Sequence, residues 1–198
     1  MSAVRALLQR KPKTLRILSA SGQLGYGIPS KALAAGLARK PDFIGCDMGS
    51  VDPGPAYLGS GEMATSPAIT RSDLEAVLVA ARRLNVPLII GSAGTAGAGP
   101  HLDATLAMIR SIAEEHQLHF RLASIRADLK PERVIQALDA GLLHALGGEL
   151  PITAADLIAS ANIVGQMGCA PFEQALELDP DVIIAGRACD TAIFAAIP

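Results

Sequence analysis

Three aspartates are the residues of this sequence best suited to chemistry. Asp47 and Asp52 lie in a glycine- and proline-rich segment, 45–61, that we expect to be a long loop, and Asp190 lies near the end of the chain. Asp47 and Asp190 each follow a cysteine close to an apolar run, so we expect both near the ends of strands. If those strands are neighbours, the two carboxylates form an acid/base pair or hold a hard divalent cation such as Mg²⁺. The alternative is that each aspartate caps a turn, as aspartate often does.

The segment 91–99 contains several glycines between an apolar run and an expected helix. The backbone N–H groups of Gly91, Ser92, Gly94 and Gly97 are therefore predicted to bind an anion, such as a carboxylate or the pyrophosphate of coenzyme A (CoA). The segment lacks the Gly-Lys-Ser/Thr of a P-loop and the order of a dinucleotide-binding GxGxxG. The alternative is a tight turn in which the glycines serve packing alone.

Four further polar residues lie where the same site is expected. Arg187 follows the apolar run 181–185 and could hold a carboxylate or phosphate through two parallel hydrogen bonds. The side-chain amide of Gln23, in a glycine turn, could form a hydrogen bond with a substrate carbonyl or only structural hydrogen bonds within its own turn. Ser50 is a further substrate-binding candidate from the long loop. His101 opens an expected helix, either as a general base or as a solvated side chain.

Apolar runs and helical periodicities alternate along the chain. We expect strands at residues 15–19, 42–46, 86–90, 118–125, 162–164 and 181–185. We expect helices at residues 30–39, 102–117, 131–140, 153–159 and 171–177, and one that begins at Ser72. The alternation predicts an α/β fold, with a three-layer, mainly parallel sheet and helices on both faces. Ligands bind such sheets at the C-terminal edge of the strands, so we expect the site there.

Two sequence patterns occur twice in the same order. A glycine-glutamine turn at 22–25 resembles the one at 165–168, and a Pro-Asp run with a later Cys-Asp at 41–47 resembles the one at 180–190. Each copy would be a strand, a glycine turn, a helix, a strand and a Cys-Asp pair. The pattern is either an internal duplication or a coincidence of residues that are common in α/β turns.

The composition restricts the class of protein. Of the 198 residues 50% are apolar and only 3% aromatic, which suits parallel strands of aliphatic residues covered by helices. The net charge of -2, without a basic stripe, argues against nucleic acid as the main partner. Three cysteines without CxxC spacing predict reduced thiols in the cytoplasm. The sequence has no apolar run long enough to span a membrane, so we expect no membrane partner.

Three blocks of the sequence resemble one family. The segment 44–61, the residues from Gly91 to Gly97 and the run 185–190 are similar, in order and spacing, to blocks of the acyclic terpene utilisation (AtuA-type) family. We expect residues 1–14 to be an N-terminal segment and residues 15–198 to form the α/β domain. Family members are usually much longer, so the resemblance implies that this domain is truncated. A homo-oligomer, or a partner that supplies the missing C-terminal portion, is then expected.

The resemblance implies catabolism of a small branched or terpenoid carboxylic acid or its CoA thioester. In this interpretation Asp47, Asp52 and Asp190 do acid/base or metal chemistry, the glycine turn binds an anion and Arg187 fixes a carboxylate. Lyase, hydratase or isomerase chemistry needs no more than these groups, whereas redox chemistry needs a cofactor motif that the sequence lacks. The alternative is a non-catalytic subunit that binds acyl-CoA or another anion or takes part in assembly.

Overall fold

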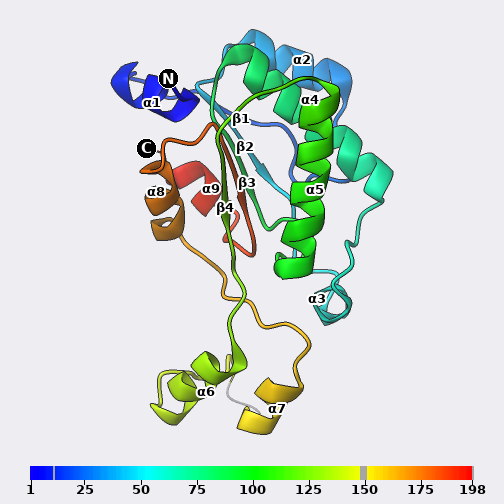
Figure 1. Ribbon diagram of the computed structural model, residues 1–198, viewed down its shortest axis with the longest axis vertical. Helices are drawn as coiled ribbons and strands as arrows, with labels where there is room; N and C mark the ends of the chain where they lie inside the picture. The colour runs from blue at the N-terminus through cyan, green and yellow to red at the C-terminus, as the bar shows by residue number, and fades with distance from the viewer. Residues whose placement is uncertain (11, 148–150, 198) are drawn as a thin grey trace.

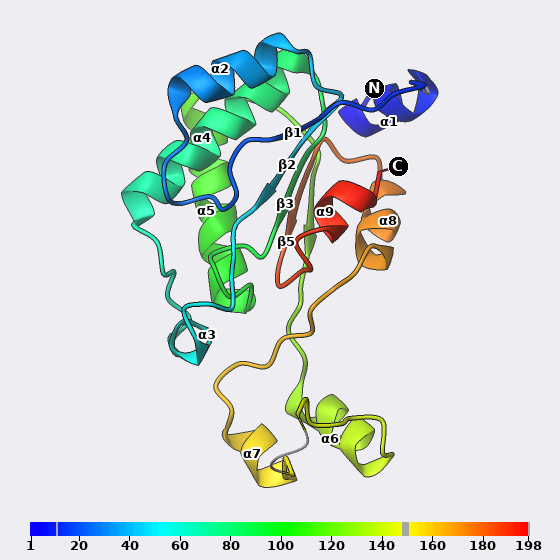
Figure 2. The same cartoon turned by 180° about the vertical axis from the view of Figure 1, so that it is seen from behind.

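A five-stranded parallel sheet forms the centre of the protein. The computed structural model describes residues 1–10, 12–147 and 151–197. The strand order is β1-β2-β3-β5-β4, and every neighbouring pair is parallel. Helices pack against both faces of the sheet (Figure 1, Figure 2). The predicted α/β fold with a parallel sheet is confirmed.

Strands and helices alternate along most of the chain. The strands are β1 (Ile17–Ser19), β2 (Phe43–Asp47), β3 (Leu88–Gly91), β4 (Leu122–Ile125) and β5 (Val182–Ala185). The helices are α1 (Ala3–Arg10), α2 (Ser30–Ala38), α3 (Pro55–Ser60), α4 (Pro67–Leu84), α5 (Gly99–Glu115), α6 (Pro131–Asp139), α7 (Ala154–Ala159), α8 (Ala170–Leu176) and α9 (Ala192–Ala195). The predicted boundary at residue 14 falls between α1 and β1.

The three middle strands are buried along their whole length. β2, β3 and β5 are apolar on both faces apart from Asp47, as expected for parallel strands covered by helices on both sides. β1 and β4 form the edges of the sheet. Ile17 of β1 is 41% exposed, because this strand has a neighbouring strand on one side only.

The direction of the chain across the sheet decides which face each helix covers. The chain moves from β1 to β3 in one direction and returns from β4 to β5 in the other, so right-handed crossovers place the helices on opposite faces. On one face, α4 and α5 pack Leu74 and Ile109 against Ile90. On the other face, α8 and α9 pack Phe172 and Ile193 against the sheet (Figure 2).

Helices α6 and α7 form an extension beyond the C-terminal ends of the strands (Figure 1). The two connections that join it to the sheet pair with each other. The Leu129 N–H donates to the Ile163 carbonyl at 2.8 Å, and the Gly165 N–H donates to the Ala127 carbonyl at 2.9 Å. The strand predicted at 162–164 is therefore wrong, since these residues pair antiparallel with the other connection and stay outside the sheet.

Two long helices begin earlier than the sequence predicts. α4 begins at Pro67 rather than at Ser72, and α5 begins at Gly99 rather than at Leu102. Both have a proline in the first turn, where its missing N–H has no intrahelical acceptor in any case. The periodic apolar residues, from which the helices were predicted, start only after that first turn.

Three short helices lie in segments where no helix is expected from the sequence. These are α1, α9 and α3, and α3 occupies part of the predicted loop 45–61. Gly54 and Gly61 flank α3 with φ angles of 79° and 77°, so both ends of this helix use a backbone conformation that favours glycine. In the part of the chain that the structure describes, no helix has the length and apolarity to cross a membrane.

Two buried aspartates hold neighbouring strands together in the same way. Asp42 precedes β2 and accepts the Arg16 N–H at 2.7 Å, and Asp181 precedes β5 and accepts the Arg121 N–H at 2.8 Å. In return, the N–H groups of the two aspartates donate to the carbonyls of the same two arginines. The strand pairs β1–β2 and β4–β5 lie on opposite sides of β3. This repeated arrangement supports an internal duplication, with residues 126–164 inserted in the second copy.

Gly49 provides a test of the packing at the C-terminal edge of the sheet. A Cβ at this position would lie 2.1 Å from the carbonyl oxygen of Thr95, in the turn after β3. We expect Gly49→Ala to lower the free energy of unfolding by about 2–4 kcal/mol, because one of the two backbones must move. Urea unfolding followed by circular dichroism measures the change.

The matched control is Gly59→Ala in α3. A Cβ there meets no atom within 4 Å, and alanine favours the helix, so stability should be unchanged or rise by about 0.5–1 kcal/mol. Equal stabilities of the two variants would contradict close contact between the two turns.

Candidate functional site

The turns after β2, β3 and β5 meet at the C-terminal edge of the sheet. The Ser92 N–H donates to the Gly186 carbonyl at 3.0 Å, and the Thr95 N–H donates to the Met48 carbonyl at 3.2 Å. The connections after β3 and β5 then lead to helices on opposite faces. In parallel sheets, ligands bind at the point where neighbouring connections diverge in this way.

Asp47 is the buried carboxyl group of this edge, with 6% of its surface exposed. Oδ2 accepts the Gly49 N–H at 3.2 Å, whereas Oδ1 has no hydrogen-bond partner among the described residues. Burial raises the pKa of Asp47 to about 6, and the negative charge of Asp190 adds to the rise. Hydrogen bonds from backbone N–H groups and the charge of Arg187 oppose it. Asp47 can therefore exchange a proton near neutral pH.

Arg187 is the buried cation of the same edge, with 7% of its surface exposed. Its backbone N–H donates to the Gly97 carbonyl at 3.0 Å, and a Cβ on Gly97 would lie 2.2 Å from the Arg187 nitrogen. The side chain lines a pocket, and its Nη1 has no hydrogen-bond partner within the described part of the chain. A buried guanidinium nitrogen without an acceptor is costly unless a ligand supplies one.

The other two predicted carboxylates are exposed. Asp190 lies close enough to raise the pKa of Asp47, so the structure brings these two residues together. The backbone N–H of Asp52 donates to Ser50 Oγ at 3.1 Å, which makes a local turn. Ser50 itself lines the same pocket as Arg187.

Most N–H groups of the glycine turn 91–99 already have acceptors within the protein. Those that donate to protein oxygens are the N–H groups of Ser92, Ala93, Thr95, Ala96, Gly97 and Gly99. The Ser92 hydroxyl is also used, since it donates to the Ala188 carbonyl at 3.1 Å. A Cβ on Gly94 would lie 2.7 Å from the Cβ of His101. The contacts of the turn thus indicate a role in packing. Anion binding by Gly91, Ser92, Gly94 and Gly97 stays a prediction.

A buried carboxylate holds the turn that contains Gln23. The side chain of Asp73 accepts backbone N–H groups from three residues of this turn, at 2.8, 3.0 and 2.9 Å. The turn touches the end of β2, where the Leu24 N–H donates to the Asp47 carbonyl at 2.9 Å. Nε2 of Gln23 is buried and has no hydrogen-bond partner among the described residues. Asp73 is not recognisable from the sequence as a residue that holds a turn, because a carboxylate in a helical pattern is usually solvated.

A pocket of about 310 Å³ opens beside these turns, next to α3. Its lining consists of Ser50, Val51, Gly54, Pro55, Leu58, Ala96, Val164, Gln166 and Arg187. Arg187 carries the only charge of this lining, and most of the other walls are apolar. Asn162 Nδ2 donates to the Leu58 carbonyl at 2.8 Å, which joins α3 to the extension. Sequence analysis missed the apolar walls, because such residues have no chemical signature until the fold gathers them.

His101 joins α5 to the loop that carries α3. It is fully buried, and its Nε2 lies 3.1 Å from the carbonyl oxygens of both Tyr57 and Glu62. The interpretation of His101 as a solvated side chain is therefore wrong. Like Asp47, His101 does not contribute to the pocket lining. Its Nε2 already bonds to two backbone carbonyls, so a general-base role lacks support.

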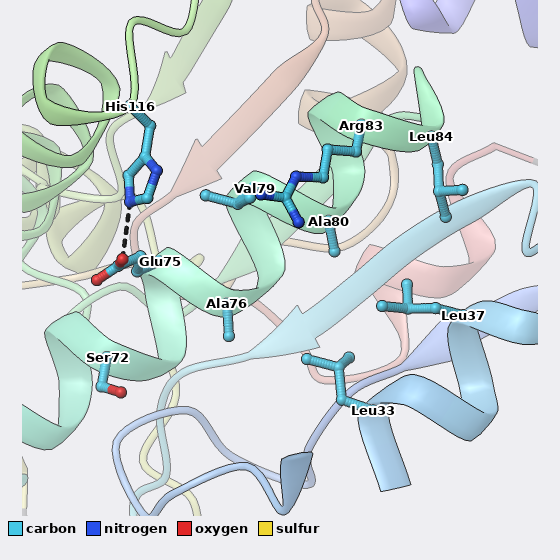
Figure 3. Close-up of a pocket in the computed structure, with 10 residues that line it drawn as sticks. All are labelled: Leu33, Leu37, Ser72, Glu75, Ala76, Val79, Ala80, Arg83, Leu84 and His116. Carbon is cyan, nitrogen blue, oxygen red and sulfur yellow. Dashed lines mark hydrogen bonds and ion pairs between the residues drawn. The ribbon is translucent and has the colours of Figure 1, made fainter. Parts of the chain in front are cut away.

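A second, larger groove of about 600 Å³ lies between α2 and α4 (Figure 3). Leu33 and Leu37 of α2 face Ala76 and Ala80 of α4 across it. At one end, His116 bonds to Glu75 at 2.7 Å. The residues predicted to act in chemistry lie elsewhere, so this groove is not the candidate site.

Asp47 and Asp190 are the predicted ligands of a divalent metal ion. Among residues 1–10, 12–147 and 151–197, no three His, Cys, Asp or Glu side chains are close enough to hold a metal ion together. Mg²⁺ usually keeps several water ligands and is bound through only one or two carboxylates, so a role of Asp47 and Asp190 as its ligands stays a prediction.

The family of the chain follows from its match over almost its whole length. A family model described as acyclic terpene utilisation family protein AtuA matches residues 16–197. The chain belongs to this family, which indicates a role in acyclic terpene utilisation, and the resemblance of the three sequence blocks is confirmed. No curated protein and no solved structure matches the chain.

The variant Asp47→Asn tests the burial of this carboxyl group. The pKa of Asp47 is about 6 in the folded protein against an ordinary 3.8, so its protonated form stabilises the folded state fully below about pH 4. This contribution is lost as the pH rises through about 6, because the buried group must then ionise. The free energy of unfolding of Asp47→Asn relative to wild type should therefore rise by roughly 1–2 kcal/mol between about pH 4.5 and about pH 7.5.

Urea unfolding at the two pH values measures this difference. Asp139→Asn, at an exposed position of α6, serves as the control and should show no such change. A constant difference between Asp47→Asn and wild type would mean that Asp47 titrates like a solvated carboxylate.

Proposed function

We propose that the protein is an enzyme that moves a proton to or from a small branched or terpenoid carboxylic acid or its CoA thioester. Lyase, hydratase and isomerase reactions on such compounds share this step. The observation that carries the proposal is a pair of buried, incompletely bonded groups of opposite charge, Asp47 and Arg187, at one sheet edge with an apolar pocket. Membership of the acyclic terpene utilisation family supports the class of ligand.

Arg187 anchors the ligand in this proposal. Arg187 is one of the lining residues of the pocket, and in the proposal a carboxylate or carbonyl oxygen of the ligand accepts hydrogen bonds from its guanidinium. The branched hydrocarbon part then lies against Val51, Leu58 and Val164. Ser50 and Gln23 are candidates for further hydrogen bonds to the ligand. Because the arginine is buried, its charge acts on the ligand with little screening by water.

Asp47 is the proposed general acid and base. A pKa raised to about 6 keeps both the acid and the carboxylate populated near neutral pH, which suits a group that must accept and return a proton. Asp190 is exposed and electrostatically coupled to Asp47, so it can pass the proton to solvent or activate a water molecule. Asp52 is a weaker base candidate, since it is exposed and only its backbone N–H is bonded.

The proton-transfer step balances with these groups alone. A carbon–hydrogen bond of the ligand breaks, its proton passes to the Asp47 carboxylate, and the electron pair moves toward the carbonyl group held by Arg187. Return of the proton to another carbon moves a double bond and completes an isomerisation. Loss or addition of water at the neighbouring carbon gives hydratase chemistry instead.

Exchange of carbon-bound hydrogen for deuterium is the direct test. The protein is incubated in deuterated water with dimethylacrylate or dimethylacrylyl-CoA, and NMR measures the label at each carbon. We expect exchange with wild type and at least about a hundredfold slower exchange with Asp47→Asn, because asparagine cannot accept the proton. Asp139→Asn should exchange at the wild-type rate. Tight binding of both compounds without any exchange would instead favour a non-catalytic binding subunit.

A further inference from the structure

We infer that the pocket beside Arg187 recognises a free carboxylic acid and rejects its CoA thioester. The inference rests on the proposed function, from which it takes the branched acyl group. It decides between the two ligand classes that the family resemblance leaves open.

The first argument concerns the charge and the hydrogen-bond acceptors that a ligand offers to Arg187. Arg187 is 7% exposed, and its Nη1 has no acceptor among the described residues. A carboxylate supplies a negative charge and two oxygens that match the fork of the guanidinium. A thioester supplies one neutral oxygen, so it brings no negative charge to the guanidinium. The free acid therefore satisfies Arg187 more completely.

The second argument concerns the negative charge that a CoA thioester carries outside the pocket, in its nucleotide part. Arg187 is the only charged residue of the lining, and an acyl group bound there already occupies it. The carboxylates of the neighbouring loops are exposed at Asp52 and Asp190. A polyanionic nucleotide would therefore approach an edge with two exposed carboxylates, which disfavours its binding.

Most N–H groups of the glycine turn already have acceptors, so the turn offers few free donors to a pyrophosphate. Six N–H groups between residues 91 and 99 are bonded to protein oxygens, and Ala96 is the turn's one contribution to the lining. The pocket volume of about 310 Å³ is at the lower end of the range for ligand sites, which suits an acyl chain without a nucleotide.

The experiment compares three ligands that share one branched chain. Isothermal titration calorimetry measures the binding of dimethylacrylate, its primary amide and dimethylacrylyl-CoA to the wild-type protein. We expect the acid to bind at least about tenfold more tightly than the neutral amide and the thioester, because only the acid brings a negative charge and two equivalent oxygens to Arg187. This ratio is obtained without any mutation, so it does not depend on the stability of a variant.

Variants at Arg187 then test the residue itself. Arg187→Gln should weaken binding of the acid by about tenfold to a hundredfold and leave the amide nearly unchanged, whereas Arg187→Lys should keep part of the preference for the acid. Arg110→Gln, at an exposed position of α5, is the control and should bind as wild type does. Circular dichroism establishes that each variant is folded before it is titrated.

The outcomes separate this inference from the proposed function. A thioester or an amide that binds as tightly as the acid overturns the inference, as does a folded Arg187→Gln protein with unchanged affinity for the acid. Deuterium exchange into the thioester without binding of the acid overturns it too, but leaves the proposed function in place. Binding of the acid through Arg187 without exchange into any ligand supports the inference and contradicts the proposed proton transfer.

Discussion

Close contact between the backbones of three turns is the constraint on which the candidate site depends. Gly49 lies against Thr95, and Gly97 lies against Arg187, so the turns after β2, β3 and β5 leave little room for water between them. The C-terminal edge of a parallel sheet is often open to solvent. Here the contact between the turns buries Asp47 and Arg187 at that edge. Burial raises the pKa of Asp47, and each of the two side chains keeps one polar atom without a hydrogen-bond partner among the described residues.

The buried carboxylates of this protein fall into two groups that differ in their hydrogen bonds. Asp42, Asp73 and Asp181 each accept two or three N–H groups, and they hold strand beginnings or a turn in place. Asp47 is equally buried but keeps one oxygen without a partner. A saturated carboxylate is explained by the structure that it stabilises. An unsaturated one at the same sheet edge as a buried arginine is the group for which we propose contact with a ligand.

The apparent duplication gives the site a simple origin. Asp47 belongs to the first Cys-Asp pair and Asp190 to the second, and the two strand pairs flank β3. If the pattern is a duplication, the residues inserted in the second copy include α6 and α7, whose connection contributes Val164 and Gln166 to the pocket. Asp47 is buried, whereas its counterpart Asp190 is exposed. A difference in burial between two neighbouring carboxylates shifts their pKa values apart, so that one can act as an acid/base group while the other faces solvent.

The sequence by itself determined the fold class and the order of the main strands and helices, and it predicted the sheet edge at which we propose the site. Apolar runs such as 86–90 and helical stripes are local, and local periodicity is a property of the chain alone. It also singled out Asp47 and Arg187, because each is a charged residue that follows an apolar strand. Only the tertiary structure decided that both are buried, that the N–H groups of turn 91–99 are mostly bonded, and that Val51, Leu58 and Val164 form the walls of one pocket. Burial and pocket walls arise from residues far apart in the sequence, so no local pattern encodes them.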